Sequence, residues 1–312
     1  MKGIELAKRY YEECGKEMLL SQFPSVRQFL AVGLSGSGSE CYGYDDELSR
    51  DHDFEPAFCI FLPGEDIVDR ATAFSLERAY SKLPHEFMGF SKNAVNPVGG
   101  SRHGVIRMDE FFLEKVGSPD GRLSPAAWLT VPEYGLLEAT NGEVFSDPYG
   151  AFSAVRERLS YFPEDVRLKK LAGHLLLMAQ SGQYNYGRCV TRGETAAAQL
   201  AVFEFAKSAL HCIYLLNRRY MPYYKWCFRG LKELPVLGEL SADLEYLISS
   251  GNGEEYERKA EIIERVCAAI AAELSAEGVA DVKNCDMEHL AYTVNDKITD
   301  GYVRNLHILH GV

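Results

Sequence analysis

The stretch Gly36-Ser37-Gly38-Ser39 is followed, after eleven residues, by Asp51-His52-Asp53-Phe54. The apolar run Phe29-Leu-Ala-Val-Gly-Leu34 precedes the glycine-rich turn, and the apolar run Ala57-Phe-Cys-Ile-Phe-Leu62 follows the two acids. Apolar segments of this length, bounded by glycine, serine and proline, are typical of buried strands. The sequence therefore predicts two strands, with a small-residue turn after the first and a pair of carboxylates at the start of the second.

Residues 51–62 are predicted to form the second strand. Because side chains alternate between the two faces of a strand, Asp51 and Asp53 are expected to lie on the same face. Carboxylates so close together repel each other unless a cation lies between them, and Mg²⁺ prefers such oxygen ligands together with substrate phosphates. Glycine also allows backbone N–H groups to approach an anion closely. The predicted phosphate-binding residues are Ser37, Gly38 and Ser39.

The composition is that of an ordinary globular protein, with 46% hydrophobic and 25% charged residues in a chain of 312. A formal net charge of −12 argues against an extended duplex nucleic acid as partner, because such binding depends on neutralising phosphates. No apolar run approaches the roughly 20 residues of a membrane helix, and the N-terminus lacks the apolar core of a signal peptide. We therefore expect a cytoplasmic protein without a membrane partner.

The eight cysteines form no CxxC pair, and several of them fall in apolar segments. This pattern is typical of buried free thiols in a reducing compartment rather than of disulfides. Their spacing does not support a zinc site.

Residues 1–150 are predicted to form an α+β domain and residues 151–312 an all-helical domain, because proline and glycine become rarer near residue 150. Apolar periodicity and turn residues predict the elements of both. In the first domain, the predicted helices are 3–20, 65–82, 109–116 and 133–140, the further strands are 104–108 and 143–146, and 93–102 is a loop. In the second, the predicted helices are 167–180, 194–220, 240–249, 254–274 and 287–310.

The pattern of Gly38-Ser39, eleven residues and Asp51-X-Asp53 resembles the signature of the nucleotidyltransferase fold, the DNA polymerase β superfamily. His52 departs from it, because an apolar residue is usual there. Three further segments, Gly43–Phe54, Val190–Glu194 and Leu216–Trp226, resemble those of a bacterial branch of that superfamily. Proteins of this branch carry a helical C-terminal domain of unknown function. The resemblance covers most of the chain. It implies a mixed sheet with flanking helices, followed by a helical domain that closes over it.

The resemblance also implies a reaction, in which a nucleoside monophosphate moves from a nucleoside triphosphate to a hydroxyl group of an acceptor. Asp51 and Asp53 would hold Mg²⁺, and a third carboxylate on a neighbouring strand usually completes the set. Here Asp109 or Glu110 follows the predicted third strand and is the candidate base, whereas Arg107 occupies a position where an acid is expected. The alternative interpretation is that Asp109 caps the following helix.

Cationic and aromatic residues near residue 220 form a second candidate group, because cations can neutralise a triphosphate and aromatic rings can stack on a base. Arg192 and Lys225 lie within the segments that resemble the bacterial branch, and they are the predicted nucleotide-binding residues. The alternative interpretation is that these residues form the end of a helix and that their cationic side chains lie in solvent.

Arg167-Leu-Lys-Lys-Leu-Ala-Gly-His174 offers a competing hypothesis. An arginine and a histidine separated by six residues on a helix resemble the ribonuclease motif of small helical toxins. A core-facing histidine is the alternative interpretation of His174, and the spacing of the other histidines does not indicate a metal site.

The sequence thus predicts a Mg²⁺-dependent nucleotidyltransferase whose acceptor it does not identify. The alternatives are a non-catalytic nucleotide-binding or partner-binding protein on the same fold and a helical-domain ribonuclease.

Overall fold

The computed structural model describes residues 1–50, 54–92, 102–253, 255–280 and 285–312. The chain forms two compact units, the first made of Met1–Leu123 and Tyr134–Ser160 and the second of Ser124–Glu133 and Tyr161–Val312. The domain boundary at residue 150 stays a prediction. By compactness, residues 151–160 belong to unit 1 and residues 124–133 to unit 2.

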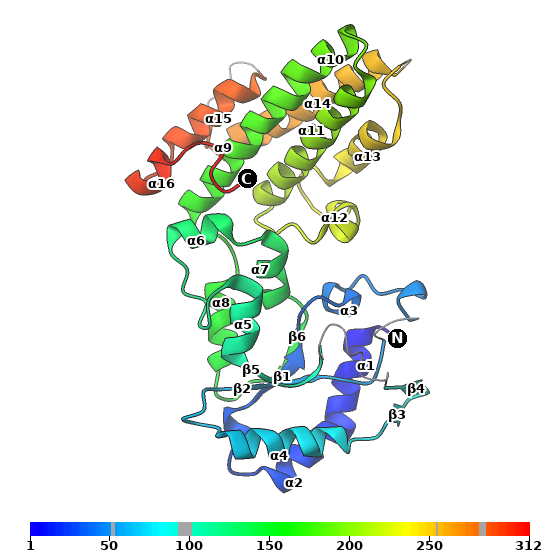
Figure 1. The fold of residues 1–312 in the computed structure, drawn as a ribbon, viewed down its shortest axis with the longest axis vertical. Helices are drawn as coiled ribbons and strands as arrows, with labels where there is room; N and C mark the ends of the chain where they lie inside the picture. Colours follow the sequence, from blue (N-terminus) through cyan, green and yellow to red (C-terminus); the bar gives the residue numbers. More distant parts are fainter. Residues whose placement is uncertain (51–53, 93–101, 254, 281–284) are drawn as a thin grey trace. The chain divides into compact units, whose positions relative to one another are not determined.

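Unit 1 is built on a mixed four-stranded sheet in the order β5-β2-β1-β6, as the α+β prediction requires (Figure 1). Strand β2 runs antiparallel to β1 and parallel to β5, and β6 runs antiparallel to β1. The strands are β1 (Ala31–Leu34), β2 (Cys59–Leu62), β5 (Gly104–Arg107) and β6 (Glu143–Ser146), and a separate ribbon pairs β3 (Glu86–Phe87) with β4 (Phe90–Ser91).

Helices cover both faces of this sheet (Figure 1). They are α1 (Gly3–Tyr10), α2 (Lys16–Gln22), α3 (Ser39–Tyr42), α4 (Arg70–Ser81), α5 (Met108–Val116), α7 (Glu133–Thr140, of which Glu133 belongs to unit 2) and α8 (Ala151–Arg158). A π-helical turn, Tyr11–Gly15, joins α1 to α2 within the predicted helix 3–20.

Alternate residues of β2 pack on opposite faces of the sheet, because side chains alternate along a strand. Ile60 and Leu62 join the core beneath α1, α2 and α4, which also holds Tyr10. On the other face, the ring of Phe61 stacks on Phe152 of α8 with centroids 4.0 Å apart. Burial on both faces explains why this strand is a continuous apolar run rather than an alternating one.

The predicted strand 51–62 is wrong in extent, because β2 begins only at Cys59. Residues 54–58 are not in a strand, and residues 51–53 lie outside the described residues. Pro56 has no backbone N–H and restricts the residue before it, which disfavours a regular ladder. The N–H of Phe58 donates instead to the Tyr80 hydroxyl, which in turn donates to the Phe58 carbonyl. The described strand β2 therefore does not determine which way Asp51 and Asp53 point, and their shared face stays a prediction.

Several other predicted elements are confirmed within a few residues, namely β5, β6, α5 and α7. Helix α4 begins later than predicted because Asp69 caps it by accepting the Thr72 N–H. The predicted helix 287–310 is wrong in extent, because the chain there forms two helices, Met287–Asp296 and Gly301–Asn305. The predicted loop 93–102 lies outside the described residues, except for its last residue. The short helices α6 and α8 were not predicted. All eight cysteines are free thiols, as expected.

Unit 2 is helical, and α9 lies between α11 and α15 within it (Figure 1). Its helices are α6 (Pro125–Thr130), α9 (Glu164–Met178), α10 (Gly187–Thr191), α11 (Thr195–Leu216), α12 (Tyr224–Leu231), α13 (Ser241–Ser249), α14 (Tyr256–Ala276), α15 (Met287–Asp296) and α16 (Gly301–Asn305). A π-helical segment, Ala179–Tyr186, continues α9. In the part of the chain that the structure describes, no helix combines the length and apolar character needed to span a membrane.

Helix α9 buries charged side chains as well as apolar ones. Arg167 has no exposed surface and pairs with Glu164 and Glu277. Lys169 is equally buried and donates to the Asn295 side chain and to the Leu306 carbonyl. Buried charges require such partners, so these contacts fix α9 against the chain that surrounds it.

The Glu164 carboxylate predicts an acid-dependent loss of stability. Hydrogen bonds from Arg167 and Arg218 lower its pKa to about 2, below the roughly 4.3 of an unfolded chain. Its contribution to folding is therefore present above pH 4.3 and is lost as the pH falls toward 2. In Glu164→Gln, the free energy of unfolding should be lower than in the wild type at neutral pH, and the difference should shrink through this window. Denaturant unfolding at a series of pH values measures it.

The matched control is Glu239→Gln, which removes an exposed carboxylate of the same unit. Its effect should be small and independent of pH. A Glu164→Gln effect that stayed constant from pH 7 to pH 2 would contradict the linkage.

Candidate functional site

The glycine-rich turn leaves the end of β1 and is held in place by the side chain of Asn141. The Asn141 Oδ1 accepts the Gly36 N–H at 2.9 Å, and its Nδ2 donates to the Gly36 carbonyl at 2.8 Å. The Ser35 hydroxyl donates to the Glu138 carbonyl at 3.0 Å. Gly36 has φ +133°, in the region that favours glycine. We call this set of contacts the Asn141 clamp.

The residues behind the clamp are fixed in turn. Arg156 donates to the carbonyls of Thr140 and Asn141 at 2.6 and 2.7 Å, which satisfies the end of α7. At Gly142 a Cβ atom would lie 1.9 Å from the Leu34 carbonyl oxygen, so only glycine allows the chain to pass this close to β1. The predicted Asn141-Gly142 turn thus has a second role, as the support of the Gly/Ser turn.

A cavity of about 210 Å³ lies at the turn. Of the predicted phosphate-binding residues, Ser37 and Gly38 line it, whereas Ser39 begins α3 and is not among the lining residues. The lining residues are Ser35, Gly36, Ser37, Gly38, Glu40, Cys41, Arg102, His103, Ile106, Phe111, Glu114 and Lys115.

Both negatively and positively charged side chains line this cavity. Glu40 is buried at 8% exposure, and its Oε1 lies 4.0 Å from the Nε2 of His103. His103 also contacts Glu55, with 3.1 Å between Nδ1 and Oε1. Lys115 pairs with Glu114 and Glu138 at 3.0 Å each. Burial lowers the pKa of Lys115, but these two acids outweigh it and raise the pKa above its ordinary value.

Of the predicted acids, Asp109 and Glu110 are described, and neither lines the cavity. Asp51 and Asp53 lie outside the described residues. Asp109 is exposed in the first turn of α5, its carboxylate accepts the Glu110 N–H, and it is not among the lining residues. Arg107, at the end of β5, donates to the carbonyls of Pro63 and Val68, so its role is structural. Glu40, which sequence reasoning passed over, is a buried carboxylate that does line the cavity.

The two predicted nucleotide-binding cations lie in unit 2. Arg192 is exposed and follows the last residue of α10. Lys225 is exposed on α12, and its ammonium lies 4.9 Å from the centre of the Trp226 ring, within the range of a cation–π contact. Their contact with a nucleotide stays a prediction.

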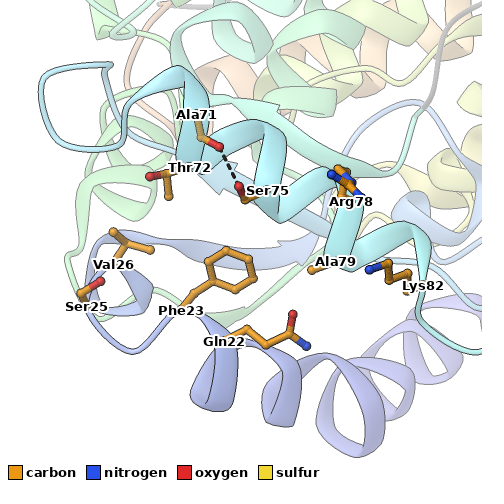
Figure 2. Close-up of a pocket in the computed structure, with 10 residues that line it drawn as sticks. All are labelled: Gln22, Phe23, Ser25, Val26, Ala71, Thr72, Ser75, Arg78, Ala79 and Lys82. Atoms are coloured by element: carbon orange, nitrogen blue, oxygen red, sulfur yellow. Dashed lines mark hydrogen bonds between the residues drawn. The ribbon is translucent and has the colours of Figure 1, made fainter.

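Unit 1 also carries an open groove of about 670 Å³ between the end of α2 and α4. Figure 2 shows Phe23 and Val26 on one side, and Arg78 and Lys82 on α4. The lining residues include no carboxylate, cysteine or histidine. The groove therefore offers none of the usual side-chain ligands of a metal ion.

Unit 2 contains a buried polar cluster that sequence spacing did not indicate. Glu133, His174 and His211 each offer a ligand atom, and these atoms lie within 4.8 Å of one another. Burial raises the pKa of Glu133, but His211 and Lys170 outweigh it and leave that pKa below its ordinary value. Burial, with His211 and Lys170 nearby, lowers the pKa of His174 well below its ordinary value, so its imidazole is neutral at neutral pH.

The same arrangement bears on the ribonuclease hypothesis. Arg167 is fully buried and ion-paired, whereas a catalytic arginine must reach an RNA phosphate. His174 is also buried, as its alternative interpretation expected. The burial of both residues argues against an RNA-cleaving site at this motif.

Comparison with known proteins gives one match. A family model described as "Domain of unknown function (DUF4037)" matches residues 128–227, a segment that includes Glu133, His174 and His211. No curated protein and no solved structure matches the chain.

The Asn141 clamp predicts a loss of local stability on substitution. Asn141→Ala removes both hydrogen bonds to Gly36 and should lower the free energy of unfolding by about 1–3 kcal/mol, because the backbone groups behind the turn lose their partner. Hydrogen–deuterium exchange of residues 31–38 should accelerate, and denaturant unfolding should report the loss.

Asn141→Asp refines the test, since it keeps the acceptor for the Gly36 N–H but replaces the donor to the Gly36 carbonyl. It should also accelerate exchange. The control is Gln28→Ala, which changes an exposed side chain of the same unit and should leave both measurements nearly unchanged. Unaltered exchange in Asn141→Ala would show that the turn does not depend on the clamp.

Proposed function

We propose that unit 1 binds a Mg²⁺–nucleoside triphosphate complex at the cavity of the Gly/Ser turn. In the proposed reaction, the hydroxyl oxygen of the acceptor forms a bond to the phosphorus atom nearest the nucleoside, and the bond from that phosphorus to the bridging oxygen of pyrophosphate breaks. Pyrophosphate leaves, and the hydroxyl proton passes to solvent water. The acceptor is an unidentified hydroxyl compound. The observation that carries this proposal is the Asn141 clamp, which holds a glycine-rich turn in a fixed shape at a cavity.

The groups around the cavity suit a phosphate chain with its metal. Ser37 and Gly38 allow close approach of an anion to the backbone, and Arg102 and His103 are the cationic or protonatable side chains beside them. Lys115 is already neutralised by two acids, so it contributes less to anion binding. The fixed shape of the turn favours binding because less conformational entropy is lost.

The proposed metal ligands are oxygen atoms, which Mg²⁺ prefers. Asp51 and Asp53 are the proposed ligands, and the buried Glu40 carboxylate is an additional oxygen donor at the cavity. When bound, the ion would neutralise charge on the phosphates as the bond to pyrophosphate breaks. Without a cation, Glu40 would repel a phosphate, so the carboxylate fits a metal–nucleotide complex better than a free anion.

A second candidate function is nucleotide binding without transfer. The observation that favours it is the position of Asp109, exposed and absent from the cavity lining, together with the structural role of Arg107. A site without a positioned base would bind the complex but leave the acceptor hydroxyl unactivated.

The double variant Asp51→Ala, Asp53→Ala tests the proposal. Titration calorimetry with Mg²⁺ and each of the four common ribonucleoside triphosphates should show binding to the wild type. The double variant should bind at least about ten-fold more weakly, because the phosphates lose their metal. Unchanged affinity in the double variant, or no binding by the wild type, would reject the proposed site.

Pyrophosphate release over a panel of hydroxyl acceptors separates the two functions. Release by the wild type that the double variant lacks supports transfer, whereas binding without release supports the second candidate. Glu65→Gln, which removes an exposed carboxylate of the same unit, is the control and should behave as the wild type in both assays.

A further inference from the structure

Three side chains from separate helical segments of unit 2 converge on one point. Glu133 is the first residue of α7, His174 lies in α9, and His211 lies in α11. Glu133 and His174 are buried, at 6% and 4% exposure, and their ligand atoms and that of His211 lie within 4.8 Å of one another. A carboxylate and two imidazoles that meet in this way are a common ligand set for a transition metal.

The contact between Glu133 and His211 already has nearly the spacing of two metal ligands. The Glu133 Oε1 lies 3.1 Å from the His211 Nδ1, and the Glu133 Oε2 accepts the Met221 N–H at 3.0 Å. Ligand atoms about 2.0–2.1 Å from a tetrahedral zinc ion lie roughly 3.3 Å apart. An ion can therefore replace the proton shared by these two side chains with little movement, while the Met221 N–H continues to orient the carboxylate.

His174 supplies a second, independent indication. Its ring stacks on that of His211, with centroids 4.3 Å apart and an angle of 5° between the planes. Its Nδ1 is buried and has no hydrogen-bond partner among the described residues. Buried polar atoms normally have a partner, and a metal ion bound by this nitrogen would provide one. Because an imidazole binds a metal in the plane of its ring, the two rings would tilt out of their parallel stack to share the ion.

Lys170 is the contact that opposes a cation. Its Nζ lies 4.0 Å from the Glu133 Oε1 and donates to the Gly311 carbonyl at 2.8 Å. The alternative is therefore a metal-free network in which Glu133 is balanced by Lys170 and His211. That network leaves the His174 Nδ1 without a partner, whereas an ion bound by this atom would provide one.

We propose that Glu133, His174 and His211 bind one divalent transition-metal ion of the zinc class. Three protein ligands leave a fourth position, which a water molecule can fill. The ion would link residues 124–133 to α9 and α11 within unit 2. This site is independent of the magnesium site proposed for unit 1, because its ligands include two imidazole nitrogens.

Metal titration of the full-length protein tests this proposal. After treatment with a chelator and its removal, the protein is titrated with Zn²⁺ in the presence of excess Mg²⁺, which occupies oxygen-only sites. One equivalent should bind to the wild type. His174→Gln and His211→Gln should each weaken binding by more than about a hundred-fold, because each removes a direct ligand. His289→Gln, which changes an exposed histidine on α15, is the control and should bind as the wild type does.

Two further measurements decide the result if the histidine variants do not fold. Co²⁺ bound to the wild type should give the visible absorption of a tetrahedral nitrogen and oxygen site, without the thiolate charge-transfer band of cysteine ligands. Lys170→Met should bind Zn²⁺ several-fold more tightly, because the competing positive charge is gone. No saturable Zn²⁺ binding by the wild type, a thiolate band, weaker binding in Lys170→Met, or unchanged binding in both histidine variants would overturn the proposal.

Discussion

The arrangement of unit 1 around its cavity depends on the pairing of the Asn141 amide with the Gly36 backbone. A turn rich in glycine has many accessible conformations, so its sequence alone does not give it a fixed shape. The Asn141 side chain accepts the Gly36 N–H and donates to the Gly36 carbonyl. It thus makes the two backbone hydrogen bonds that a residue of a neighbouring strand would make, just beyond the end of β1. Arg156 holds the backbone of Asn141 in turn. The shape of the proposed phosphate site is therefore set by residues more than a hundred positions away in the chain.

Sequence reasoning found most elements of unit 1 but not the contacts that make the cavity. Strands β5 and β6 were predictable because short apolar runs are bounded there by glycine, asparagine and proline. Strand β2 was predicted too long, because the alternation of Asp51 and Asp53 was extended through Pro56, where the ladder does not form. Asn141-Gly142 was predicted as a turn. Its role as a clamp follows only from the pairing of β1 with β6, which local sequence does not reveal.

In unit 2, too, the sequence did not reveal the contacts between distant segments of the chain. Arg167, Lys169 and Lys170 are three cations close together in the sequence, yet α9 buries all three. Their partners include carbonyls and a carboxylate from the C-terminal third of the chain, namely those of Leu306, Gly311 and Glu277. Periodicity describes one helix at a time, and so it cannot indicate that distant segments supply the partners that allow charges to be buried.

The same reasoning explains why the sequence indicated a candidate site in unit 1 but not the one in unit 2. The Gly/Ser turn and the acids after it are close in sequence, so their spacing carries information about a shared site. Glu133, His174 and His211 come from three segments, and no spacing rule links them. Their chemistry becomes visible only when the packing of α9 against α11 brings the two imidazole rings into a stack beside a buried carboxylate. Oxygen donors in one unit and nitrogen donors in the other favour different ions, so the two proposed metals need not compete for a site.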